Sequence, residues 1–298
     1  MLSYLVFLLV VGGIYALLAQ SLMLAWGMTG LVNLGLAGFF AIGAYASAMP
    51  TKWGGVPVAF GLLAALVVGA AAGLVVTLST LRLRDDYLAI VTLGFAEAVR
   101  IIAANEIWLT GGTDGISGIP GGFARDWGPG FHTAWLAAVA LILLAIWAAL
   151  RRLVRSPWGR ALRAVREDQI VAGVAGKNVV RLKAEAFAIA AGIAALAGAL
   201  YGHYTSYIAP DLFQPLVTIY VFLAATAGGN ARPSGALIGA YLLVFFLEST
   251  RFAAERVPGV TAVQAAALRE MATGLALILL LHLCPGGVLP ERNQKAPA

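Results

Sequence analysis

A glutamate and an arginine lie three residues apart inside an apolar stretch of the chain, at Glu97 and Arg100. Residues at this spacing are neighbours on one face of a helix, so their charges can neutralise each other. Ionisable side chains are expensive within a membrane and usually face a water-filled cavity or a partner. The pair is therefore a candidate for ligand contact or proton transfer. The alternative is a position near the outer edge of the membrane.

A glycine-rich polar segment follows the same apolar stretch, between residues 106 and 130, and its candidate residues are Thr110, Gly111, Gly112 and Asp114. Glycine with threonine and aspartate can form a phosphate cradle, but the segment lacks the GK[ST] ending of such loops. We expect a docking or gating loop outside the membrane.

Asn33 and Thr92 are two further polar candidates within apolar runs. Glycines near Asn33, from Gly27 to Gly30, predict a broken or re-entrant helix. The Asn33 amide can hydrogen-bond a ligand, although a buried asparagine more often ties neighbouring helices together. Both interpretations stay open.

Several kinds of chemistry lack support in the sequence. The nearest resemblance to a P-loop, at Gly176 and Lys177, lacks the upstream glycine and the final hydroxyl residue. The histidines His132, His203 and His282 are far apart, and neither an HExxH motif nor a cysteine cluster accompanies them. A GxSxG elbow is also missing. We therefore predict neither a catalytic residue nor a metal site.

The composition is that of a membrane protein with several spans. Hydrophobic residues make up 61% of the 298, charged residues 11%, and the mean hydropathy is +0.88. Uncharged runs of 18 or more residues indicate helices, because barrel strands are short and alternate in polarity. The pI of 9.7 does not indicate a nucleic-acid partner, because the basic residues flank apolar runs as the positive-inside rule expects. The first 51 residues carry no charged side chain, so we expect the N-terminus to stay as a membrane segment.

We predict an all-α bundle of eight or nine transmembrane helices. The predicted spans are residues 2–26, 30–49, 56–81, 87–105, 131–150, 184–208, 212–228, 235–250 and 268–284. Small residues spaced four apart let helices approach closely. They occur at Gly69 and Gly73, at Ala194, Gly198 and Gly202, and at Gly235 and Gly239. We therefore expect tight helix pairs.

Residues 151–183 hold nearly all the excess positive charge, with nine Lys/Arg and two acidic residues. The positive-inside rule places this segment in the cytoplasm. Ser156 suits an N-cap and Pro157 a first helical position, so a helix should begin there and end near Gly176. Its apolar stripe is Trp158, Ala161, Leu162 and Val165, and its polar stripe is Arg160, Arg163 and Glu167. Three interpretations of residues 151–183 stay open: an ordinary cytoplasmic loop, a helix attracted to anionic lipid, or a docking helix for a separate cytoplasmic protein. We favour the docking helix.

Three stretches resemble the LivM type of the branched-chain amino acid ABC permease family. They are YLAIVTLGFAE at 87–97, LTGGTDGISGIP at 109–120 and SPWGRALRAVRED at 156–168. The resemblance implies a permease subunit of the bacterial inner membrane. Its implied partners are a homologous second permease of LivH type, two cytoplasmic ATPase subunits and a periplasmic solute-binding protein. The chain itself then needs no cofactor, because the partner subunits bind ATP.

The resemblance also implies roles for the candidate residues. The segment that couples motion to the ATPases would include Ser156, Pro157, Trp158, Gly159, Arg160, Leu162, Arg163, Arg166, Glu167 and Asp168. The candidate pathway or gating residues are Asn33, Thr92, Glu97, Arg100, Thr110, Gly111, Gly112 and Asp114. Urea, short amides and other small polar solutes stay open as substrates. A proton-coupled secondary transporter with Glu97 as carrier is the rival of another class, and the sequence argues against a membrane-embedded enzyme.

Overall fold

A computed structural model describes residues 2–80, 85–123, 129–255, 261–283 and 286–289. The α-helices are α1 (Leu2–Leu22), α2 (Leu36–Trp53), α3 (Val58–Thr80), α4 (Asp85–Asn105), α5 (Ile107–Thr110), α6 (Pro129–Arg155), α7 (Pro157–Glu167), α8 (Gln169–Val174), α9 (Val179–Thr205), α10 (Pro215–Gly228), α11 (Pro233–Glu255) and α12 (Ala262–Leu283). The shorter elements are the π-helix η1 (Met23–Gly27), the 3₁₀ helices η2 (Gly112–Asp114) and η4 (Pro210–Phe213), and the strands β1 (Ile116–Ser117) and β2 (Tyr207–Ile208). The positive-inside rule predicts that Arg82, Arg84 and the tail 291–298 face the cytoplasm, and these residues lie outside the described ones.

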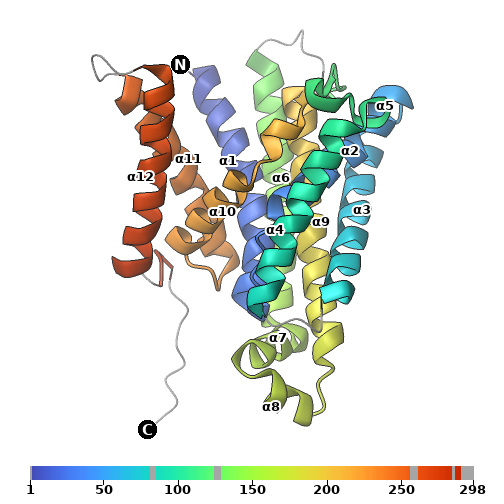
Figure 1. Cartoon of the computed structure of the whole chain (residues 1–298), viewed down its shortest axis with the longest axis vertical. Coiled ribbons are helices and arrows are strands. Elements are labelled where there is room, and N and C mark those ends of the chain that lie inside the picture. The colour runs from blue at the N-terminus through green and yellow to red at the C-terminus, as the bar shows by residue number, and fades with distance from the viewer. Residues whose placement is uncertain (1, 81–84, 124–128, 256–260, 284–285, 290–298) are drawn as a thin grey trace.

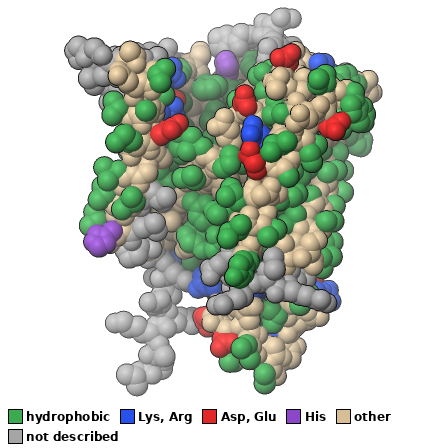
Figure 2. Space-filling model, viewed as in Figure 1, with side chains coloured by type: hydrophobic (Ala, Val, Ile, Leu, Met, Phe, Trp, Pro, Cys, Tyr) green, Lys and Arg blue, Asp and Glu red, His purple; other side chains and the backbone are tan. Residues whose placement is uncertain are grey.

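The long helices form one bundle, with α7 and α8 beyond its lower end and α5 at its upper end (Figure 1). Seven of the described helices are long and apolar enough to cross a membrane. Apolar side chains cover much of the surface between the two ends (Figure 2). Such a surface suits lipid, because a soluble protein rarely exposes large apolar patches. The predicted all-α multi-pass fold is confirmed.

The helices outside these seven include α2 and α12, which fall in the predicted spans 30–49 and 268–284. Full crossing by these two helices stays a prediction. Helix α6 continues to Arg155, so the helix does not end with the predicted span at residue 150 and the basic segment begins within it. Arginine is a good helix former, and the last turn of a helix favours basic side chains.

Glycines bring the helices into backbone contact, as the small-residue spacings predict. A Cβ added to Gly69 would overlap the side chain of Ala195, which joins α3 to α9. One added to Gly198 would overlap the carbonyl oxygen of Phe40, which joins α9 to α2. Helix α9 is thus the centre of the packing, and most of its residues are buried.

Two short helices, α2 and α10, begin beside each other within the bundle and run to opposite ends. At their starts, the Ala37 N–H donates to the Thr218 hydroxyl oxygen at 3.1 Å. Helix α2 then leads to Ser47, whose hydroxyl lies 2.7 Å from Nε2 of His203 near the upper end. Helix α10 ends at Gly228, beside the start of α11 at the lower end. Both are shorter than the 27-residue helix α9, and α10 reaches the length of a span only together with η4.

Candidate functional site

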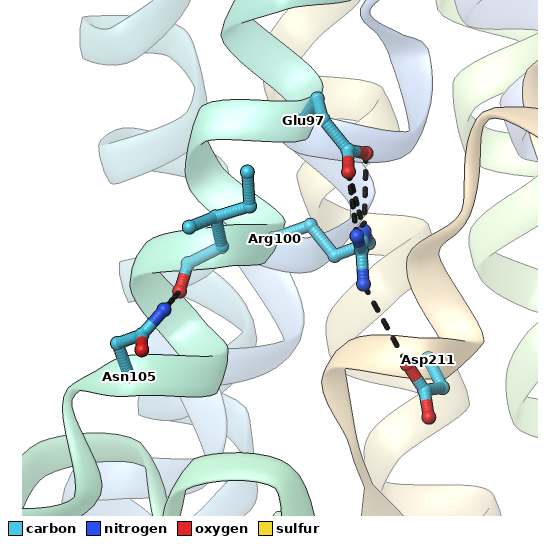
Figure 3. A network of polar contacts seen from close by, with 5 residues as sticks. Glu97, Arg100, Asn105 and Asp211 are labelled. Carbon is cyan, nitrogen blue, oxygen red and sulfur yellow. Dashed lines mark hydrogen bonds and ion pairs between the residues drawn. The ribbon is translucent and has the colours of Figure 1, made fainter.

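The predicted pair on α4 forms an ion pair, and it has a third member (Figure 3). Arg100 Nε donates to Glu97 Oε2 at 3.0 Å and to Oε1 at 3.1 Å. Arg100 Nη1 also lies 3.6 Å from Oδ1 of Asp211 on η4. The side chains of Arg100, Glu97 and Asp211 are 25%, 37% and 78% exposed. We call these three residues the charged triad.

The charged triad interrupts an otherwise apolar face. Acidic and basic side chains lie together over α4 with hydrophobic side chains around them (Figure 2). Glu97 is eight residues from the Asn105 end of this 19-residue span. At a rise of 1.5 Å per residue that distance is about 12 Å, near the middle of the span. Arg100 is five residues from the same end, and Asp211 is the second residue of the span Pro210–Gly228. The charged triad thus reaches from the middle of one span to the end of another, so a position near the membrane edge stays an open alternative.

Asn33 and Thr92 lie together, and both are buried. The Leu34 N–H donates to the Thr92 hydroxyl oxygen at 3.1 Å, and the Gly35 N–H donates to Asn33 Oδ1 at 2.9 Å. The predicted break is confirmed, because residues 30–35 are not helical and α2 begins at Leu36 rather than near residue 30. Buried N–H groups at such a break need acceptors, and these side chains supply them. Holding the broken segment is the role that the hydrogen bonds support.

The glycine-rich loop is fixed to the upper end of the bundle. The Thr110 hydroxyl donates to the Ala103 carbonyl oxygen at 2.6 Å and accepts from the Gly112 N–H at 3.2 Å. Gly111 and Gly112 have φ values of +77° and +65°, which favour glycine. The Asp114 carbonyl oxygen accepts from the Tyr207 hydroxyl at 3.2 Å.

Strand pairing completes the attachment of the loop, with β1 antiparallel to β2. His203 Nδ1 lies 2.6 Å from the Pro120 carbonyl oxygen, and Ser47 holds the other ring nitrogen. The loop is thus joined to both α2 and α9. A gating or docking role for it stays a prediction.

Helix α7 begins as the capping pattern predicts, with Ser156 as N-cap and Pro157 in the first position. Leu162 and Val165 of the predicted apolar stripe are fully buried, and Trp158 Nε1 donates to Glu185 of α9 at 2.9 Å. The polar stripe of Arg160, Arg163 and Glu167, with Arg166, lines a cavity between α7 and the ends of α6 and α11. Helix α7 is therefore attached to the bundle.

The prediction of one helix ending near Gly176 is wrong. Helix α7 ends at Glu167, and Asp168 begins the new helix α8 by accepting from the Ile170 and Val171 N–H groups at 2.8 and 3.0 Å. An aspartate in extended backbone that accepts hydrogen bonds from the next N–H groups is an N-cap. It favours the start of a new helix over the continuation of the preceding one. Ala172 of α8 is buried, but its larger apolar side chains point outward, with Ile170 79% and Val174 87% exposed.

The structure joins some predicted residues and separates others. Helix α4 carries Thr92, Glu97 and Arg100, whereas the residues of α7 lie at the far end of the bundle from Thr110. Sequence reasoning missed Asp211 and Thr218. Asp211 comes more than 100 residues after Arg100, and one sequence carries no signal for that contact.

A bundle of apolar helices, with two short helices that begin beside each other within it and a charged group on a spanning helix, is typical of a membrane transport protein. Discontinuous helices of this kind usually border the route of a solute. The family described as "Branched-chain amino acid transport system / permease component" matches residues 4–282. The chain belongs to this family, and the predicted multi-pass membrane localisation is confirmed.

Relatives of both permease types are similar to the chain. The high-affinity branched-chain amino acid transport system permease protein LivM of Salmonella typhimurium is 36% identical over 80% of this chain and 61% of its own length. The probable LivM of Methanocaldococcus jannaschii is 30% identical over 79% of this chain and 69% of its own. LivH of Salmonella typhimurium is 28% identical over 93% of this chain and 92% of its own length. The chain thus spans about three-fifths of the first LivM relative, and no solved structure matches it.

Proposed function

We propose that this chain is a permease subunit of an ATP-binding cassette importer that moves branched-chain amino acids across the inner membrane. The family match over residues 4–282 is the observation that carries the proposal. In this proposal the chain pairs with a LivH-type permease and receives its substrate from a periplasmic binding protein. Two cytoplasmic ATPase subunits bind and hydrolyse ATP. The chain itself is not an enzyme and holds no cofactor.

The face with the charged triad supports pairing with a second permease. Partly exposed charges on a spanning helix would be unfavourable against lipid, whereas a route between two subunits would keep them hydrated. A free amino acid carries one ammonium and one carboxylate, and the triad presents both signs of charge. We propose that this face borders the route.

The lower end of the bundle supports contact with the ATPases. Helix α7 is attached to α6 and α9, so a push on it would reach two spanning helices. Helix α8 offers exposed apolar side chains that lie outside the bundle (Figure 1). Exposed apolar clusters on a protein commonly mark a site of protein contact. We propose that α8 makes the main contact and that α7 transmits the motion.

The double substitution Ile170→Asp and Val174→Asp tests this assignment. We expect the variant to insert normally and to lose at least about 90% of the ATPase that copurifies with wild type, because carboxylates are costly in an apolar interface. A matched control is Ala175→Asp with Val180→Asp, which adds the same charge at exposed positions beyond the end of α8. Equal ATPase recovery in the α8 variant and wild type would contradict the contact.

Transport by the assembled complex tests the proposed function. The chain, the LivH-type permease, the two ATPases and the binding protein would be placed together in liposomes with labelled solute outside. We expect uptake of leucine, isoleucine and valine that needs ATP. Uptake of urea or formamide instead would contradict the branched-chain substrate but keep the assignment to an ATP-driven importer. Uptake by the chain alone under a proton gradient would favour the secondary transporter.

A further inference from the structure

A cavity of about 1360 Å³ lies where α6 ends, α7 crosses the bundle and α11 begins. We call it the arginine basin. Its charged lining residues are Arg151, Arg155, Arg160, Arg163, Arg166, Arg232 and Glu167. Six guanidinium groups thus face one carboxylate. Like charges gathered this closely repel one another, so an anion in the basin would be stabilising.

The walls of the basin hold several of these side chains in place. The Arg151 guanidinium carbon lies 5.1 Å from the centre of the Trp147 ring, and Trp147 Nε1 donates to the Ser234 hydroxyl at 3.2 Å. Arg160 donates to the Arg155 carbonyl oxygen at 3.3 Å, and Arg166 donates to the Gly27 carbonyl oxygen. A guanidinium has five N–H donors, so the contacts of Arg151 and Arg160 leave donors that can bind a phosphate.

The end of a predicted span places the basin at the level of a membrane surface. The apolar span Gly130–Arg155 ends in its wall, with Arg155 in the last turn of α6 and Arg151 just before that turn. Tryptophan is enriched at this depth, where the Trp147 ring borders the cavity. The positive-inside rule makes this the cytoplasmic surface, where the lipid headgroups carry negative charge.

An apolar groove adjoins the basin. It is a cavity of about 430 Å³ between α10, α11 and α12, lined by Leu223, Ala227, Leu242, Leu243, Phe246, Ala276, Leu279, Leu283 and Val288. Val288 faces this groove, and the next residue, Leu289, lines the basin. Backbone hydrogen bonds fix both residues to the end of α10. The Val288 N–H donates to the Ala227 carbonyl oxygen at 2.9 Å, and the Leu289 N–H donates to the Gly228 carbonyl oxygen at 3.0 Å. A polar cavity and an apolar one therefore meet at one short segment.

We propose that the arginine basin and the adjoining groove bind an anionic phospholipid, with its phosphate among the arginines and an acyl chain in the groove. Arginine recognises phosphate by paired hydrogen bonds as well as by charge. An acidic protein segment would match the basin but would not fill the groove. A bound lipid would link α7 to the start of α11, since Arg163 and Arg232 lie on opposite sides of the basin.

The test is lipid binding to the full chain, measured by mass spectrometry of the intact protein in detergent. The probes are phosphatidylglycerol, phosphatidylcholine with the same acyl chains, and glycerol phosphate. We expect wild type to prefer phosphatidylglycerol over phosphatidylcholine. The variant Arg163→Gln with Arg232→Gln should bind phosphatidylglycerol about thirtyfold more weakly, from about fivefold for each arginine near the headgroups.

A matched control is Arg152→Gln with Lys177→Gln, which removes the same charge from exposed positions outside the basin. It should bind as wild type does. The variant Arg163→Lys with Arg232→Lys keeps the charge and should lose less than the glutamine variant, which also guards against misfolding. Equal losses in the basin and control variants would overturn the proposal. So would glycerol phosphate binding as tightly as the lipid, because the site would then recognise a free phosphate.

Discussion

The Gly198→Leu variant should not accumulate as a folded protein. Even a Cβ at this position would overlap the Phe40 carbonyl oxygen, and it would crowd the Ala44 backbone nitrogen at 3.0 Å. The overlapping atoms are backbone, so no side-chain rotation relieves them. We expect destabilisation of more than about 3 kcal/mol, because overpacking against a rigid neighbour forces whole helices apart. The measurement is the yield of monodisperse protein after solubilisation.

Gly94→Leu is the matched control for this prediction. Gly94 is also a glycine of a spanning helix, but a Cβ there meets no atom within 4 Å. The control should keep most of the wild-type yield. If Gly198→Leu gave wild-type yield and melting temperature, the close contact between α9 and α2 would be wrong.

The Arg100→Gln variant should lose at least about 99% of transport while still being inserted. Removing the guanidinium leaves Glu97 and Asp211 as two carboxylates without their cation. Breaking a partly desolvated ion pair from one side is strongly destabilising, typically by about 3 to 5 kcal/mol when the pair is buried. We expect less than that range here, because the side chains are 25% to 78% exposed. The measurement is ATP-driven uptake by the assembled complex.

The Arg100→Lys variant separates the effect of charge from that of hydrogen-bond geometry. It keeps the cation but loses the paired hydrogen bonds to Glu97, so it should keep part of the activity.

Glu97→Gln tests the proton-carrier alternative. Uptake that survives Glu97→Gln at every pH would exclude an obligatory proton relay, and full uptake in Arg100→Gln would remove the charged triad from the route.

Local patterns determined much of what the sequence predicted correctly. The spanning helices followed from apolar runs of sufficient length, because a backbone in lipid must satisfy its own hydrogen bonds. The start of α7 followed from Ser156 and Pro157, since an N-cap acts on N–H groups two or three residues away. The pairing of Glu97 with Arg100 followed from helix geometry. In each case the interacting groups are near neighbours in the chain.

The tertiary structure decided what depends on distant residues. Asp211 joins Glu97 and Arg100, and Thr218 caps the start of α2, because the chain folds back to bring η4 and α10 against α4 and α2. The end of α7 was predicted wrongly at Gly176. The prediction placed Asp168 inside one continuous helix, whereas its carboxylate caps the start of the next helix.

The sequence by itself determined the class of the protein, because hydropathy, charge asymmetry and short motifs are properties of contiguous residues. Only the tertiary structure decided which side chains share a surface. Six arginines from α6, α7 and the start of α11 form one basin, and exposed apolar residues identify α8 rather than α7 as the outermost helix. The physical reason is that burial and charge density depend on positions in space, and helix packing sets those positions.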